Sequence, residues 1–289
     1  MTSPDYLGCI ADIETLARIC HKYGAVLLVD NAHGACLPFY RQNLHPISLG
    51  ADMCCDSAHK MLPALTGAAY LHLREKKYIP YIKDSMLLFA STSPSYLISC
   101  SLDLCNLFLE KEIREKLVFA QDAVSGLRDR VSGKFSVQKG TFAQEPLHFT
   151  INAYSSGIDG SILMKKLQEN KIECEFYCDT HLVMLFSPSD TEEAYQKVGD
   201  ALMNIDFEKK TFSEKKLHFP LPQKHMSVRE AALSPYEELP IEKSEGKICA
   251  NINVPFPPAI PISVSGEIIT AECIDIMRRF GLTTIKVVK

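Results

Sequence analysis

The sequence lacks the features that would place the protein in a membrane, in the secretory pathway or on nucleic acid. No apolar stretch approaches the ~20 residues that a membrane-spanning helix needs. The first five residues contain neither the charged nor the apolar segment of a signal peptide. The 31 basic and 35 acidic residues give a net charge of -4, and no basic run is present. Nucleic acid and anionic membranes are therefore not expected as partners.

The sequence also lacks paired cysteine motifs, although it contains 11 cysteines. Their number is odd, no CxxC pair occurs, and only Cys54 and Cys55 are adjacent. This pattern argues against a disulfide framework and against a zinc knuckle. We therefore expect reduced cysteines that pack as small apolar groups, no metal site, and a cytoplasmic protein.

The first part of the chain has the pattern of an α/β fold. Apolar residues recur with helical spacing over residues 12–23, and Gly24 follows where a left-handed C-cap is wanted. Residues 25–29 form a continuous apolar run, which is typical of a parallel strand covered on both faces. Further strands are predicted at 51–55 and 68–73. Ligands in such folds bind beyond the carboxyl ends of the strands.

The 289 residues can bury one large core or two medium ones. Residues 78–131 have a helical pattern with a break at 91–94, where Ser95 is a plausible N-cap. The stretch 104–127 is expected to run as one long helical segment between two domains. The predicted domains are residues 1–132, 133–206 and 207–289. Within them we expect strands at 135–138, 147–153, 172–177 and 182–186, helices at 159–170, 191–204 and 271–280, and a polar linker over 207–246.

Lys60 is the residue that points to chemistry. It follows a short apolar run, and Asp30 lies at the end of the earlier run. A lysine amine and a strand-end carboxylate suit pyridoxal phosphate (PLP), which needs an amine for its Schiff base and an acid beside its pyridine nitrogen. Taken singly, each residue has an ordinary explanation, since most lysines are solvated and strand-end aspartates are common in turns.

Several stretches along the chain carry a more specific signal, and they occur in the order found in one family. They are residues 2–8, 29–35, 57–60, 93–96 and 255–261. With these stretches the sequence resembles the Orn/Lys/Arg decarboxylase family, PLP enzymes of the aspartate aminotransferase fold (fold type I). The resemblance implies an α/β chain in which part of a fold type I major domain is followed by a small C-terminal α/β domain. It also implies a homo-oligomer that acts on lysine, ornithine or arginine.

Family members carry a long region before the residue that matches Thr2. That region supplies a phosphate-binding turn and a side chain that stacks on the cofactor. We therefore expect this chain to be a C-terminal portion of such an enzyme. We expect the sheet to expose an edge and an apolar face that this region normally covers. We also expect the 289-residue chain on its own to bind PLP weakly, to self-associate through the uncovered surface, and to show no measurable decarboxylation.

The resemblance assigns the central roles to three residues. Lys60 forms the Schiff base with the cofactor, and Asp30 keeps the pyridine nitrogen protonated. Ala32 is small enough for the ring to lie against the strand.

Further residues are implied around these three. Ser57 and His59 are expected as phosphate ligands, and an equal alternative for His59 is to orient the lysine. His33 is expected near the ring as a proton-transfer group. The alternative is that His33 is a buried histidine whose hydrogen bonds are made within the core. Thr92 and Ser93 match a stretch that approaches the phosphate from a neighbouring subunit.

The sequence departs from the family pattern at a few positions. Asn31 and Cys36 stand where Glu and a second His are usual, and Ala259 and Ser265 stand where Gly and Pro are usual. None of these changes removes a proposed contact with the cofactor, but they are compatible with a substrate pocket that differs from that of other family members.

Two other functions are compatible with the sequence. An aminotransferase of the same fold would require an arginine that clamps a carboxylate, and Arg278 and Arg279 lie outside the matching stretches. A non-catalytic truncated homologue is the other alternative. No acidic residue can be assigned to the amine end of a substrate, so the sequence does not distinguish lysine, ornithine and arginine.

Overall fold

The computed structural model describes residues 1–89, 93–212, 220–251 and 261–289. The chain folds as two compact units, Met1–Ser213 and Glu214–Lys289. Among the described residues, no helix is long and apolar enough to cross a membrane. The 11 cysteines all lie in the described part of the chain and are free.

The first unit begins with a three-stranded sheet in the order β2-β3-β4. Strand β2 (Leu28–Asp30) is parallel to β3 (Met53–Asp56), and β4 (Tyr70–Leu73) is antiparallel to β3. Helix α1 (Ile13–Lys22) precedes them. It begins at Asp12, whose side chain accepts a hydrogen bond from a backbone N–H of the first turn, and Gly24 follows it with φ +68°. The predicted helix and its glycine C-cap are confirmed.

The prediction that residues 25–29 are covered on both faces is wrong for the part of the chain that the structure describes. Val29 is 2% exposed, whereas Leu28 next to it is 54% exposed and Leu71 on β4 is 46% exposed. Successive side chains of a strand point to opposite faces. One face of the sheet packs against α1, with Ile13 beside Val29, and the other face is open.

A helical segment follows the sheet. It consists of the short helix η1 (Lys76–Tyr78), α3 (Ile79–Phe89), α4 (Tyr96–Lys111) and α5 (Ile113–Val131). The Ser95 side chain accepts a hydrogen bond from the backbone N–H of Ile98, so the predicted N-cap is confirmed. The single helical segment predicted over 104–127 is wrong, because the chain turns at Glu112, which ends α4 and precedes α5. The turn lets α5 bury Ile113 and Leu117.

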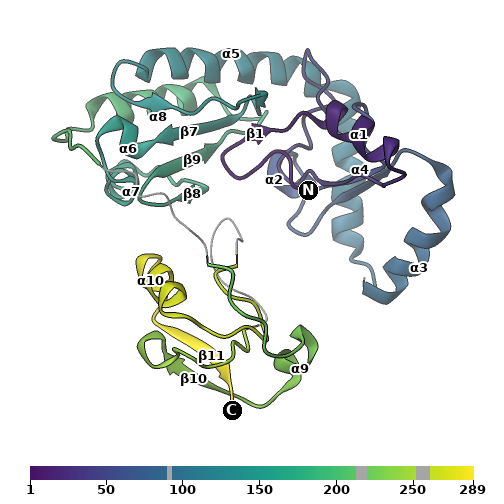
Figure 1. Ribbon diagram of the computed structural model, residues 1–289. Coiled ribbons are helices and arrows are strands. Elements are labelled where there is room, and N and C mark those ends of the chain that lie inside the picture. The colour runs from purple at the N-terminus through teal and green to yellow at the C-terminus, as the bar shows by residue number, and fades with distance from the viewer. Residues whose placement is uncertain (90–92, 213–219, 252–260) are drawn as a thin grey trace. The chain divides into compact units, whose positions relative to one another are not determined.

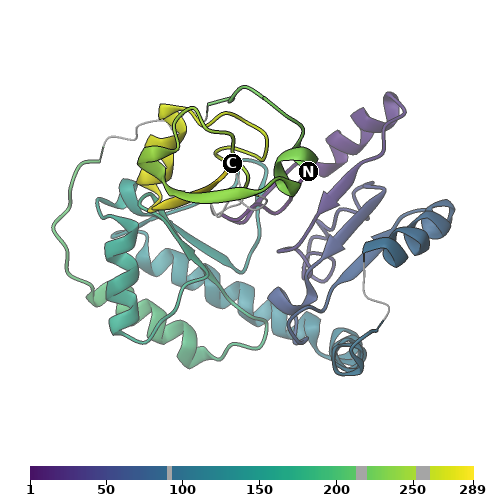
Figure 2. The ribbon, with the colours of Figure 1, turned by 90° about the horizontal axis from the view of Figure 1, so that it is seen from below.

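A four-stranded antiparallel sheet completes the first unit, in the order β5-β7-β9-β8. Its elements are β5 (Ser136–Val137), β7 (His148–Asn152), α6 (Ala153–Ser156), α7 (Gly160–Glu169), β8 (Phe176–Tyr177), β9 (His181–Leu185) and α8 (Glu192–Asn204). Helices α5 and α8 lie side by side along this sheet (Figures 1 and 2). Strand β1 (Cys9–Ile10) pairs with β6 (Ala143–Gln144) and joins the start of the chain to this part of the fold.

One hydrophobic core runs through most of the first unit. It includes Ile10, Leu117, Phe149, Leu167 and Leu202, which come from widely separated elements. The domain boundaries expected at residues 132 and 206 remain predictions.

The second unit contains α9 (Val228–Leu233), β10 (Tyr236–Pro240), the short helix η2 (Ile241–Lys243), α10 (Ala271–Arg279) and β11 (Thr284–Val288). Strands β10 and β11 pair antiparallel. The expected linker over 207–246 is therefore wrong in its second half, where a Ser227–Glu230 capping box starts α9. The predicted helix at 271–280 is confirmed. Nearly all of the matching stretch 255–261 lies outside the described residues.

Candidate functional site

Lys60 lies at the end of the first sheet where its two parallel strands finish. It belongs to α2 (Ala58–Met61), which follows β3 directly. Parallel strands end at the same edge of a sheet. Asp30 at the end of β2 and Lys60 after β3 therefore belong to the same edge. Both residues are exposed.

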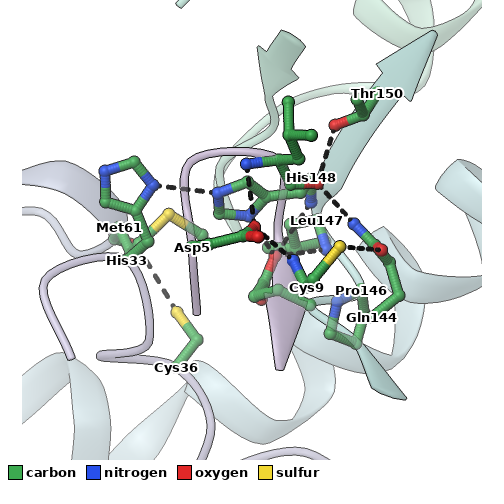
Figure 3. Close-up of polar contacts among 12 residues, drawn as sticks. Asp5, Cys9, His33, Cys36, Met61, Gln144, Pro146, Leu147, His148 and Thr150 are labelled. Carbon is green, nitrogen blue, oxygen red and sulfur yellow. Dashed lines mark hydrogen bonds and ion pairs between the residues drawn. The ribbon is translucent and has the colours of Figure 1, made fainter. Parts of the chain in front are cut away.

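A chain of hydrogen bonds leads from the Lys60 amine into the protein. Lys60 Nζ lies 2.8 Å from His33 Nε2, and His33 Nδ1 lies 2.9 Å from His148 Nε2. His148 Nδ1 lies 2.8 Å from Glu145 Oε2, and Tyr40 donates its hydroxyl hydrogen to Glu145 Oε1. Figure 3 shows the His33 ring pointing at the His148 ring, which lies at the start of β7. We call these five residues the Lys60 relay.

The buried members of the Lys60 relay have one consistent set of donors and acceptors. Burial, with smaller contributions from the adjacent His148 and Lys60, lowers the pKa of His33 to about 3, so its ring is neutral near pH 7. A neutral His33 that accepts a hydrogen bond at Nε2 from Lys60 must donate from Nδ1 to His148. His148 then donates from its own Nδ1 to the Glu145 carboxylate.

Glu145 anchors the inner end of the relay. Its side chain is fully buried, and its Oε2 atom also accepts hydrogen bonds of 2.8 Å from the backbone N–H groups of Leu147 and His148. Burial, followed by the charge of Glu145, raises the pKa of Tyr40, which therefore stays a donor. Arg128 holds the same turn from outside the relay, donating to the carbonyl oxygens of Pro146 at 3.1 Å and His148 at 2.6 Å.

Tyr6 provides an aromatic wall beside this site. Its ring centroid lies 4.9 Å from that of His33, and Lys60 Nζ lies 5.9 Å from the Tyr6 ring centroid. The segment that carries Tyr6 is held to the end of β2, because the backbone N–H of Ser3 donates to the carbonyl oxygen of Asp30 at 2.9 Å.

The other residues singled out from the sequence take varied positions. Asp30 Oδ1 accepts a hydrogen bond of 3.2 Å from the backbone N–H of Ala32. His59 Nδ1 lies 2.9 Å from the carbonyl oxygen of Ala68, which fixes the orientation of the ring. Ser57 precedes α2 without a capping side-chain bond. These three roles remain predictions.

Thr92 and Ser93 are the two residues expected to approach the phosphate from another subunit. Ser93 is exposed in the loop before α4, and Thr92 lies outside the described residues. Their role remains a prediction.

Inspection of the sequence missed three members of the relay, namely His148, Glu145 and Tyr40. Only the polar pair Glu145 and His148, beside the apolar start of a strand, gave a local hint. The contact between His33 and His148 joins residues 115 positions apart, and no local pattern predicts such a contact.

The neutral His33 gives a pH-dependent stability that can be measured. The pKa of His33 is about 3 in the folded protein against an ordinary value of 6.5. Between these values the unfolded chain binds the proton and the folded chain does not. The contribution of the neutral His33 to the free energy of unfolding is therefore complete above pH 6.5. It falls as the pH falls towards 3, by about 1.4 kcal/mol per pH unit.

We expect the difference in unfolding free energy between the wild type and His33→Gln to decrease by about 2–3 kcal/mol from pH 7.5 to pH 4.5. Urea unfolding at each pH measures it. His225→Gln is the control, because that ring is already exposed in the fold. A constant His33→Gln difference would contradict a neutral, buried His33.

Comparison with known proteins places the chain in a family. Residues 1–133 match the model "Orn/Lys/Arg decarboxylase, major domain", and residues 206–283 match "Orn/Lys/Arg decarboxylase, C-terminal domain". The chain belongs to the Orn/Lys/Arg decarboxylase family. It is similar to the arginine decarboxylase of Bacillus subtilis (strain 168), with 29% identity over 290 residues, covering 94% of this chain and 59% of that protein. The chain thus spans about three fifths of that relative's length.

Solved structures show the same fold. The lysine decarboxylase LdcF of Francisella novicida superimposes with a TM-score of 0.79 at 16% identity, over 100% of this chain and 57% of that chain. A structure of SPT with PLP superimposes with a TM-score of 0.52 at 17% identity, over 70% and 52%. The expected α/β fold, a partial fold type I structure, is confirmed.

Proposed function

We propose that this protein takes part in the PLP-dependent decarboxylation of a basic amino acid. The observation that carries the proposal is the Lys60 amine, hydrogen-bonded to the buried and neutral His33 at the sheet edge where Asp30 lies. Membership of the Orn/Lys/Arg decarboxylase family supports the same reaction.

The chemistry of the side chains at this edge fits PLP. Lys60 Nζ is a primary amine for the aldehyde, and Asp30 is an exposed carboxylate for the pyridine nitrogen. The described residues form no Lys or Arg ion pair with Asp30. Ala32 adds only a methyl group beside it. When bound, PLP supplies an aldehyde that reacts with amines and a ring that withdraws electrons from the bonds at the substrate Cα.

The protein residues orient the groups around this chemistry through hydrogen bonds. His33 presents an unprotonated Nε2 that accepts a hydrogen bond from the Lys60 amine and fixes its position. His148 and Glu145 keep the His33 hydrogen on Nδ1, which leaves Nε2 free to accept. Tyr6 covers the ring of His33 and restricts water there.

The substrate class follows from the family, and we propose lysine, ornithine or arginine without a choice among them. We also propose a homo-oligomer as the working form. Large apolar side chains exposed on α3 and α4 support it, since Phe89 is 90% exposed and Tyr96 is 83% exposed. No observation favours an aminotransferase, because Arg278 is paired with Asp275 at 2.7 Å.

Carbon dioxide release tests the proposal. The assay uses the enzyme of which this chain is expected to be the C-terminal portion, with the N-terminal region of the family present and with added PLP. Arginine, lysine and ornithine are the substrates, and glutamate is the control substrate. Release from a basic substrate alone supports the proposal. Release from none of the three basic substrates would contradict it and would favour a non-catalytic homologue.

Asp30→Asn is expected to lower turnover by about 10- to 100-fold. The change removes a charge-assisted hydrogen bond to the ring nitrogen, worth roughly 1.5–3 kcal/mol. The Asp30 carboxylate is exposed and accepts from the backbone N–H of Ala32 at 3.2 Å and from the Cys55 thiol at 3.9 Å, so folding should be kept. Asp12→Asn is the matched control, since asparagine caps helix α1 as well as aspartate does. Equal turnover in both variants would show that Asp30 is only a turn residue.

A further inference from the structure

A second group of polar side chains lies on the covered face of the first sheet. It comprises His45, Cys54, Asp56 and His72, and we call it the Asp56 cluster. Cys54 and Asp56 are two residues apart on β3, so they share one face. His72 on β4 is the cross-strand partner of Cys54. His45 comes from the loop between β2 and β3. Three separate segments thus converge on one point.

A ring nitrogen from each of His45 and His72 and a carboxylate oxygen of Asp56 lie within 4.8 Å of one another, close enough to ligate one ion, and the Cys54 thiol approaches His45 and Asp56. Asp56 Oδ2 lies 3.2 Å from His45 Nε2 and 3.0 Å from His72 Nε2. Cys54 Sγ lies 3.6 Å from His45 Nε2 and 3.9 Å from Asp56 Oδ1. With Zn–N and Zn–O bonds of about 2.0–2.2 Å and a Zn–S bond of about 2.3 Å, tetrahedral ligands are about 3.3–3.6 Å apart.

The Asp56 carboxylate is a buried charge that a cation could pair with. The Asp56 side chain is 3% exposed, and in the described part of the chain its ion-pair partners are the two histidines rather than a lysine or an arginine. Burial opposes its charge, but hydrogen bonds from His45, His72 and Asn31 hold the pKa of Asp56 below its usual range. A buried carboxylate is stable when it is paired or coordinates a metal.

Zinc would complete this charge balance. A coordinated thiol loses its proton. One Zn²⁺ with the Asp56 carboxylate and the Cys54 thiolate is neutral overall, which suits a buried position.

The surroundings also suit a metal. Asn31 donates to Asp56 Oδ1 at 2.7 Å, and this contact leaves Oδ2 directed at the two histidines. The His72 side chain is 38% exposed, which gives the ion access from solvent, whereas that of His45 is 6% exposed.

We infer that His45, Cys54, Asp56 and His72 bind one Zn²⁺ that ties β3, β4 and the loop before β3 together. Binding releases the Cys54 thiol proton to solvent and leaves both imidazoles neutral, with their hydrogens on Nδ1. The thiol as fourth ligand favours zinc over metals that prefer oxygen ligands. The absence of a CxxC pair led to the expectation of no metal site. Spacing cannot reveal ligands from three separate segments.

Metal analysis and cobalt substitution of the full-length protein test the inference. We expect one zinc per chain after removal of loosely bound metal. We expect Co²⁺ to give the visible bands of a tetrahedral site and a thiolate-to-metal charge-transfer band. If the wild-type chain binds neither zinc nor cobalt stoichiometrically, the cluster is held by hydrogen bonds alone and the inference is wrong.

Matched variants test the assignment of ligands. His45→Gln should weaken zinc affinity by ~100-fold or more, whereas His21→Gln should not change it, although His21 also contacts an aspartate, Asp52, at 2.9 Å. Cys54→Ser should abolish the charge-transfer band, and Cys55→Ser, on the opposite face of β3, should keep it. Circular dichroism verifies that each variant is folded. A band that survives Cys54→Ser, or is lost in Cys55→Ser, would overturn the assignment.

Discussion

Lys60→Ala is expected to remove all covalent attachment of the cofactor. When the wild-type protein is incubated with PLP and reduced with borohydride, peptide mass spectrometry should find a pyridoxyl group on Lys60. The same treatment of Lys60→Ala should give no stoichiometric pyridoxyl label on any other lysine. The expectation rests on the 2.8 Å contact that places the unprotonated Nε2 of His33 against the Lys60 amine.

The fold should survive this substitution, because the Lys60 side chain is exposed and contributes little packing. Lys22→Ala is the matched control. Lys22 is an exposed lysine in the last turn of α1, and its replacement should leave the Lys60 label unchanged. A label on another lysine, with Lys60 untouched in the wild type, would contradict the central assignment.

The local patterns of the chain predicted the elements that carry the proposed chemistry. Helical spacing and Gly24 located α1, and an apolar run that ends in Asp30 located the strand edge. Lys60 and His33 were both expected beside the cofactor from the family resemblance, and the structure brings these two into contact. Such features depend on neighbouring residues, so a sequence displays them directly.

Other features depended on packing and were not visible. A continuous apolar run does not reveal whether one or two faces of a strand are covered, so the exposure of Leu28 was expected from the family resemblance and not from the strand pattern. The turn at Glu112 has neither Gly nor Pro to mark it. It arises because Ile113 and Leu117 reach the core only if the chain changes direction there.

The relay itself was the least predictable part. His33 follows β2, whereas Glu145 precedes β7 and His148 is the first residue of β7, and a tertiary contact across 115 positions joins the two segments. The same holds for the Asp56 cluster, in which His45, Asp56 and His72 are brought together by a loop and by the pairing of β3 with β4.

Glu145→Ala is expected to cause the largest loss of stability of any change proposed. The buried Glu145 carboxylate accepts hydrogen bonds from the Tyr40 hydroxyl, the His148 ring and the backbone N–H groups of Leu147 and His148. The substitution leaves the Tyr40 hydroxyl, the His148 ring and the Leu147 N–H buried without a partner, at about 1–3 kcal/mol each, whereas the His148 N–H keeps a 3.2 Å bond to the Glu145 backbone carbonyl. The sum is on the order of 4 kcal/mol or more, comparable with the 5–15 kcal/mol that holds a whole domain folded.

Urea unfolding followed by circular dichroism measures this loss, and Glu175→Ala is the matched control. Glu175 is exposed and accepts one side-chain hydrogen bond, 3.1 Å from the Tyr6 hydroxyl. Water can replace it, so the control should cost less than about 0.5 kcal/mol. Glu145→Gln separates charge from shape. It keeps one carbonyl acceptor but turns N–H groups towards existing donors, so its loss of unfolding free energy should lie between those of Glu145→Ala and Glu175→Ala. If Glu145→Ala unfolded at the wild-type urea concentration, Glu145 could not be the anchor of the relay.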